Sequence, residues 1–166
     1  MTFKKAVKET PNLQNSWKPG LGALRSQDRP HIKAEDTHML RGSVDVDTAL
    51  KFTQPNASRW DFAIGYMHEN RTLESVYWVE THTGSDDQIN VVLKKLQWLK
   101  NWLRDDGRKL AAFEREIVWV ASGSTSFTNG ATQVKTLAVR GLRYSGKILR
   151  IPKQHPSPRA ANEIRA

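Results

Sequence analysis

The chain has 166 residues, no cysteine and a formal net charge of +9 at neutral pH. That length is enough for one domain with its own core, and the lack of cysteine excludes disulfides, thiolate zinc sites and cysteine catalysis. No apolar segment approaches the roughly 20 residues that cross a bilayer, and the first residues lack the hydrophobic region of a secretory signal, so we expect no membrane association and a cytoplasmic location.

Charge is unevenly distributed along the chain. Basic residues outnumber acidic ones over residues 1–43 and 107–166, whereas acidic residues are in excess over residues 44–106. Basic flanks around an acidic middle are the layout expected for phosphodiester chemistry, because the flanks can hold a polyanion while the carboxylates address one phosphate. The alternative is that basic residues only keep a small protein in solution. We expect a nucleic-acid partner, with candidate contacts at Arg143, Lys147 and Arg150.

The first half of the chain predicts an irregular arm followed by three strands. Residues 1–36 carry few apolar positions and several Pro and Gly residues, which indicates a basic, mostly irregular arm with one short helix around Leu21–Arg25. Alternation of Val and Asp over Gly42–Leu50 is typical of a half-buried strand. Two further strands are predicted at Trp60–Met67 and Leu73–Thr81.

The second half predicts helices alternating with strands. Ser85 and Gln88 form a capping box at the start of an apolar stripe that Gly107 ends, which indicates a long helix. The remaining predicted elements are a buried strand at 116–121, a helix at about 131–140, a last strand at 146–151 and a disordered basic tail at 153–166. This order describes one α/β domain over residues 37–152, with crossover connections after an initial meander. No phosphate-binding loop motif is present.

Carboxylates and a histidine converge in the predicted sheet. Glu80 and His82 are two residues apart in a strand and therefore share a face. If the strands on either side of the turn near residue 70 pair as a hairpin, Asp61 at the start of the first approaches Glu80 near the end of the second. Two adjacent carboxylates repel unless a cation or a proton intervenes, which is the basis for a Mg²⁺ or Mn²⁺ site. Asp47, in the acidic middle, is a further candidate ligand.

The residues GSVDVDTAL, RWDFAIGY and WVETHT, in this order of elements, resemble the core of the PD-(D/E)xK nuclease superfamily. The resemblance implies a restriction-endonuclease-like fold, with a mixed sheet of about five strands flanked by helices. It also implies that Asp61 and Glu80 are metal ligands and that His82 stands where the family usually has its lysine. His82 would orient or deprotonate water or bind the metal, and Lys94 or Lys95 from the long helix would supply the missing cation.

These observations favour a divalent-metal-dependent nuclease with Asp61, Glu80, His82 and Lys95 as its candidate catalytic residues. One alternative is a catalytically inactive relative that binds nucleic acid or another protein. In that case Asp61, Glu80 and His82 would form an internal polar network, or an arginine would hold Glu80 in a structural ion pair. Another alternative is a basic partner of an acidic protein with no affinity for nucleic acid.

Overall fold

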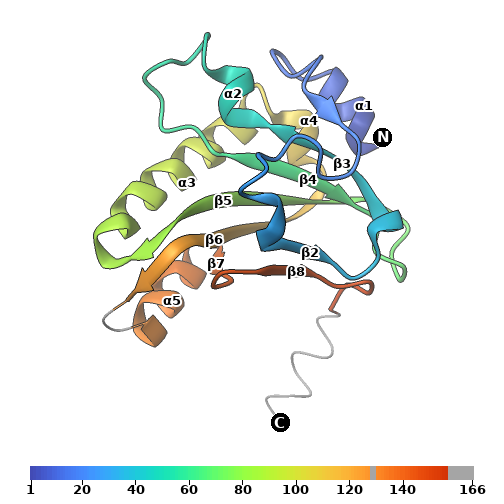
Figure 1. Cartoon of the computed structure of the whole chain (residues 1–166). Coiled ribbons are helices and arrows are strands. Elements are labelled where there is room, and N and C mark those ends of the chain that lie inside the picture. The colour runs from blue at the N-terminus through green and yellow to red at the C-terminus, as the bar shows by residue number, and fades with distance from the viewer. Residues whose placement is uncertain (128–129, 157–166) are drawn as a thin grey trace.

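The computed structural model describes residues 1–127 and 130–156, and its centre is a six-stranded mixed sheet of order β1-β3-β4-β5-β6-β7 (Figure 1). The strands are β1 (Trp17–Lys18), β3 (Leu40–Asp45), β4 (Phe62–Tyr66), β5 (Ser75–Ser85), β6 (Glu114–Ser126) and β7 (Leu142–Tyr144). Strands β3, β4 and β5 form an antiparallel meander, and β6 and β7 add in parallel beyond β5. The predicted α/β class is confirmed.

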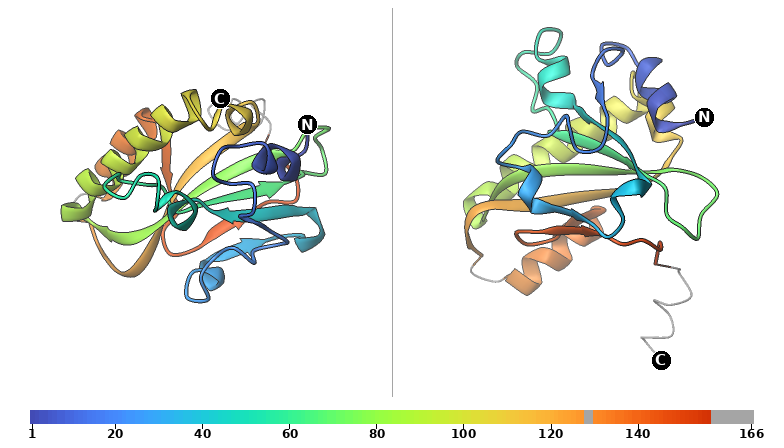
Figure 2. Two further views of the ribbon diagram at one scale, coloured as in Figure 1. Left: turned by 90° about the horizontal axis from the view of Figure 1, so that it is seen from above. Right: turned by 45° about the vertical axis from the view of Figure 1, so that its right-hand side comes forward.

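Helices cover one face of this sheet. They are α1 (Phe3–Lys8), α3 (Ile89–Arg104), α4 (Arg108–Ala111) and α5 (Gly130–Val139), and the left view of Figure 2 shows α3 and α5 on the same side of the sheet. The short α2 (Val46–Leu50) follows β3. Helix α3 connects β5 to β6, and α5 connects β6 to β7; such crossovers let consecutive strands run parallel.

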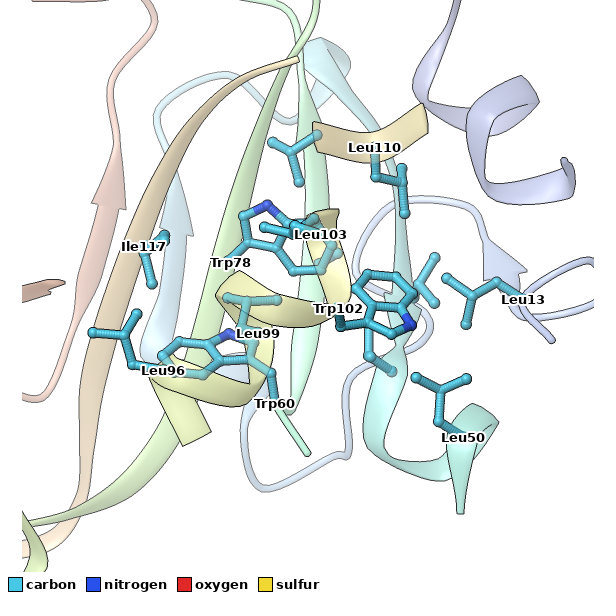
Figure 3. Close-up of a cluster of buried hydrophobic side chains, with 14 of the residues drawn as sticks. Leu13, Leu50, Trp60, Trp78, Leu96, Leu99, Trp102, Leu103, Leu110 and Ile117 are labelled. Atoms are coloured by element: carbon cyan, nitrogen blue, oxygen red, sulfur yellow. The ribbon is translucent and has the colours of Figure 1, made fainter. Parts of the chain in front are cut away.

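The core between the helices and the sheet is rich in tryptophan (Figure 3). The apolar stripe of α3 places Leu96 and Leu99 against the sheet, where Trp60 and Trp78 are fully buried. Trp78 meets Trp102 edge to face, with ring centroids 5.9 Å apart. This arrangement agrees with the helical spacing of the apolar residues of α3, which predicts that its indoles belong to the core.

A second, smaller sheet covers the opposite face. It consists of β2 (Ile32–Ala34) and β8 (Leu149–Ile151), which pair in parallel. Alternate residues of these strands are buried against Tyr77 and Val79 of β5, which point away from the helices because side chains alternate along a strand. Two 3-10 turns flank β2, η1 (Arg29–His31) and η2 (Thr37–Met39). The chain is therefore layered as helices, main sheet and small sheet.

The N-terminal segment is mostly turns, as the sequence predicts, but it packs against the core and begins with a helix. Helix α1 begins after Thr2, whose side chain accepts a hydrogen bond from the Lys5 amide, and Phe3, Ala6 and Val7 are buried in the main core. The helix predicted around Leu21–Arg25 is a series of turns instead. Only six residues form α1, which is too short for hydrophobic periodicity to reveal.

The substitution Gly65→Ala tests whether α1 packs tightly against β4. A Cβ atom at this position of β4 would lie 2.6 Å from Phe3 Cγ, so Gly65→Ala forces a buried ring to move. We expect the substitution to lower the free energy of unfolding by about 1–3 kcal/mol, the usual cost of overpacking. In urea denaturation the cost should shrink in a Phe3→Leu background, and an equal cost in both backgrounds would contradict this packing.

Two other boundaries differ from the prediction. The strand predicted over Gly42–Leu50 ends at Asp45, whose carboxylate accepts a hydrogen bond from the Thr48 amide and caps α2. Helix α3 begins only at Ile89, after the 3-10 turn η3 (Asp86–Gln88), and the Ser85 hydroxyl makes no capping bond. The main sheet has six strands, in line with the predicted mixed sheet of about five, and β1 and β7 have only two and three residues, too few to show alternation.

The predicted tail is held to the domain where the structure describes it. The Lys153 amide donates to a Glu35 carboxylate oxygen at 2.6 Å, and the His155 amide donates to Asn70 Oδ1 at 2.8 Å. The rest of the predicted tail, 157–166, lies outside the described residues. Among residues 1–127 and 130–156, no helix combines the length and apolar character needed to cross a membrane.

Candidate functional site

The register of β4 and β5 places Asp61 beside Glu80. Phe62 pairs with Val79, so the next step of the antiparallel register brings Asp61 opposite Glu80. The Asp61 amide donates to Glu80 Oε2 at 3.1 Å, and the Thr81 amide donates to Asp61 Oδ2 at 3.1 Å. The structure thus brings together the two carboxylates that the sequence predicts to converge.

Lys95 supplies a cation to both carboxylates. Its ammonium group donates to Glu80 Oε1 and lies 3.8 Å from Asp61 Oδ1. Lys95 stands three residues after Val92 and four before Leu99, so helical spacing places it on the buried stripe of α3. Its neighbour Lys94 is exposed. Of the two lysines that the sequence offers as the missing cation, the structure brings Lys95 to the pair and leaves Lys94 in solvent.

Burial dominates the electrostatics of this cluster. The side chain of Glu80 is 0 % exposed, and desolvation, reinforced by the charge of Asp61, raises its pKa well above the usual range. Desolvation also raises the pKa of Asp61. Burial alone would lower the pKa of Lys95, but the charges of Glu80 and Asp61 outweigh burial and raise it. The carboxylates therefore lie in a setting that disfavours negative charge even with the ammonium present.

Arg25 approaches the cluster from the N-terminal segment. Its Nη2 atom lies 3.8 Å from Asp61 Oδ2 and 3.3 Å from Thr81 Oγ1, while its Nε atom donates to Asp28 Oδ2 at 2.6 Å. The Arg25 side chain is 48 % exposed, so this contact is weaker than that of Lys95. The sequence analysis missed Arg25, since it lies in a run of turns with no periodicity that would orient it.

His82 lies at the border of the cluster. Its Nε2 atom is 2.6 Å from Gln88 Oε1, and its Nδ1 atom is 3.9 Å from Glu80 Oε1. A neutral ring that donates Nε2–H to Gln88 leaves Nδ1 as a proton acceptor on the side of Glu80. The His82 side chain is 26 % exposed, so solvent reaches it. The predicted position of His82 beside Glu80 is therefore present, without a direct hydrogen bond between them.

Asp47 does not join the predicted ligand set. Its carboxylate accepts from Arg59 Nε at 2.9 Å, and its charge reaches Lys95 only through space. Within the described ranges, no group of three or more His, Cys, Asp or Glu residues is placed to hold a metal ion. The prediction of Asp47 as a third ligand is wrong, because α2 replaces the end of the predicted strand and turns this carboxylate toward Arg59.

The predicted nucleic-acid contacts are divided between two elements. Arg143 lies in β7 and donates to Glu116 Oε2 at 2.8 Å, so part of its charge is neutralised. Arg150 is the exposed middle residue of β8, and Lys147 is exposed in the turn before it. The basic last third of the chain therefore presents separate patches.

Asp61 and Glu80 give the cluster two carboxylates that could bind a hard divalent cation, but Lys95 already contacts both. Mg²⁺ is commonly held by one or two carboxylates, with water and substrate phosphate completing its coordination. Asp61 and Glu80 would be the two carboxylates, and their raised pKa values show that the ammonium of Lys95 does not fully offset the cost of their burial. The Lys95 ammonium already contacts the same oxygens, so a divalent ion and Lys95 would compete for them.

Comparison with known proteins gives no match: neither a family model nor a curated protein nor a solved structure aligns with the chain.

Proposed function

We propose that the chain is a divalent-metal-dependent nuclease that hydrolyses phosphodiester bonds in nucleic acid. The proposal is supported by the order of elements, an antiparallel meander followed by a helix and a parallel strand. It is also supported by the placement of Asp61 before the second strand of the meander and of Glu80 in the third. This pattern resembles the PD-(D/E)xK core.

The observation that carries the proposal is the position of Lys95. The superfamily that the sequence resembles usually places a lysine two residues after the second acidic residue, where this chain has His82. Helix α3 brings an ammonium group to the same two carboxylates from a different element. The acidic pair and its cation are therefore complete, although the lysine comes from the helix.

Each residue would have a distinct role. Asp61 and Glu80 would hold Mg²⁺ or Mn²⁺, which when bound activates water and stabilises charge on the phosphate. Lys95 would offset charge on the scissile phosphate, because its ammonium lies beside both carboxylates. His82 would accept a proton from the attacking water through Nδ1, which faces Glu80 and is not occupied by Gln88.

Cleavage assays on matched carboxylate variants test this proposal. We expect the parent protein to cut DNA or RNA with Mn²⁺ or Mg²⁺ and to be inactive with EDTA. Asp61→Asn should abolish cleavage, whereas Asp47→Asn, which removes a nearby carboxylate outside the pair, should leave it nearly unchanged. Equal activity of the parent and Asp61→Asn, or a parent inactive on every substrate with both metals, would contradict the proposal.

A second candidate is a binding module that has lost cleavage. The same contacts favour it, because Lys95 already compensates both carboxylates without a metal ion. Such a protein would bind nucleic acid or a protein partner, and neither Mn²⁺ nor EDTA would change its stability. Thermal unfolding with and without Mn²⁺ separates this candidate from the nuclease, since an ion that binds only the folded state raises stability.

A further inference from the structure

Four basic side chains from different parts of the fold surround a hollow at the edge of the main sheet. Lys100 comes from α3, Arg115 from β6, Arg143 from β7 and Arg140 from the turn before β7. The hollow has a volume of about 410 Å³, and its other lining residues are Glu116, Ile117 and Gly141. We refer to it as the β6-edge hollow.

The hollow exists because β7 is shorter than β6. The pairing of β6 with β7 starts at Ile117 and Leu142, so Arg115 and Glu116 extend beyond the first residue of β7. The chain reaches this point from α5 through Gly141, which has φ +81°. A Cβ atom at Gly141 would meet no other atom within 4 Å, so the turn borders open space. Figure 1 shows α5 and β7 at this end of the sheet.

Among the described residues, three of the four cations of the hollow have no acidic partner, and Arg143 is the exception. Lys100 Nζ donates to the Arg140 carbonyl at 2.7 Å, and Arg115 Nη1 donates to the Ala111 carbonyl at 3.2 Å. Carbonyl oxygens orient a cation but carry no formal charge to cancel it. Within the described residues, the Arg140 guanidinium has no hydrogen-bond or ion-pair partner. Glu116 is the one acidic lining residue, and it pairs with Arg143 at 2.8 Å.

We infer that the β6-edge hollow binds the sugar–phosphate backbone of nucleic acid, an inference that rests on the proposed function. Guanidinium groups suit phosphate because their planar N–H donors match two oxygens at once. Ile117 is the one apolar side chain in the lining, and no aromatic ring is present there on which a base could stack. The hollow therefore reads phosphates and not bases, so binding is independent of sequence.

The same helix connects the hollow to the carboxylates. Lys95 and Lys100 are five residues apart on α3, which corresponds to about 7.5 Å along the helix axis and about 140° around it. One strand of duplex DNA advances about 3.4 Å per nucleotide. At that rise the axial offset corresponds to about two nucleotides, but Lys100 faces a different side of α3 from Lys95, so the hollow and the carboxylates would contact different parts of a bound strand.

Salt-dependent binding of a labelled duplex of mixed sequence, measured by fluorescence anisotropy in EDTA, tests the inference. The double variant Lys100→Gln/Arg140→Gln should bind about tenfold more weakly or worse at 0.1 M salt, and the slope of log affinity against log salt should decrease by about 1.8 units. The matched control Lys8→Gln/Lys51→Gln removes the same charge from exposed positions elsewhere and should bind like the parent. The single charge reversal Arg140→Glu, at an exposed residue, should also weaken binding.

The outcomes separate the hollow from the catalytic proposal. Equal losses of affinity in the test and control double variants would show that only overall charge matters and would overturn the inference. Undetectable binding by the parent at low salt would also overturn it. If the parent cleaves and Lys100→Gln/Arg140→Gln binds nucleic acid normally, the binding role of the hollow would be refuted and the nuclease proposal would stand. If the parent never cleaves and only Lys100→Gln/Arg140→Gln loses binding, the nuclease proposal would be refuted and the binding role of the hollow would stand.

Discussion

Replacing Lys95 with methionine is expected to lower the free energy of unfolding by about 3 kcal/mol at neutral pH, because removing one partner of a buried ion pair leaves uncompensated charge. Methionine retains much of the apolar stem of lysine but removes the ammonium that contacts Glu80 and lies 3.8 Å from Asp61. The Lys95 side chain is only 19 % exposed, so solvent cannot replace this contact.

The adjacent lysine gives the matched control. Lys94→Met makes the same chemical change one position earlier on α3, at an exposed side chain, and should alter stability by less than about 0.5 kcal/mol. Urea denaturation of both variants measures the difference. A loss in Lys95→Met no larger than in Lys94→Met would show that the ammonium does not stabilise the carboxylates.

The change Glu80→Gln should have the opposite effect on stability at alkaline pH. The pKa of Glu80 is raised in the folded protein by desolvation and by the charge of Asp61. A carboxyl with a raised pKa contributes stability that is fully present below the unfolded-state pKa, about 4.3, and is lost as pH rises through the folded-state pKa. Glutamine does not titrate, so the variant should lose less stability than the parent as pH increases.

In Glu80→Gln the ammonium of Lys95 should still have an acidic partner, since Asp61 remains 3.8 Å away. The rate of cleavage should nevertheless fall more than about 100-fold. Mutating residues that only hydrogen-bond to metal ligands commonly lowers metal affinity or activity about 10–100-fold, and Glu80 is itself a proposed ligand. Thermal unfolding across pH and cleavage with Mn²⁺ are the two measurements. A Glu80→Gln protein that loses as much stability as Lys95→Met would mean that Glu80 serves mainly as the partner of a buried cation.

The placement of the acidic pair could be predicted from sequence because it depends on local rules. Period-two alternation fixes which residues of β5 share a face, and a hairpin fixes which residue of β4 lies opposite Glu80. The long stripe of α3 likewise identifies a helix, although η3 delays its start. The same stripe contains the signal for Lys95, because a lysine between Val92 and Leu99 at helical spacing must face the sheet and requires a carboxylate.

Other features depend on contacts that no local pattern encodes. Arg25 reaches Asp61 from a run of turns, and its approach depends on how the N-terminal segment folds over the sheet. The alternation of Val and Asp near Asp45 fits a strand, but the Asp45 cap on Thr48 ends the strand and starts α2. The β6-edge hollow arises from the difference in length between two strands, which is visible only in three dimensions.

The most direct test of the central claim, that Asp61 and Glu80 hold a divalent cation, is calorimetric titration of Mn²⁺ into the parent, Lys95→Met and Glu80→Gln. We expect the parent to bind one Mn²⁺ ion, Lys95→Met to bind it more tightly because no ammonium competes for the same oxygens, and Glu80→Gln to show no such binding. Identical heats for the parent and Glu80→Gln, with no gain in Lys95→Met, would contradict the metal site and leave the cluster as an internal ion pair.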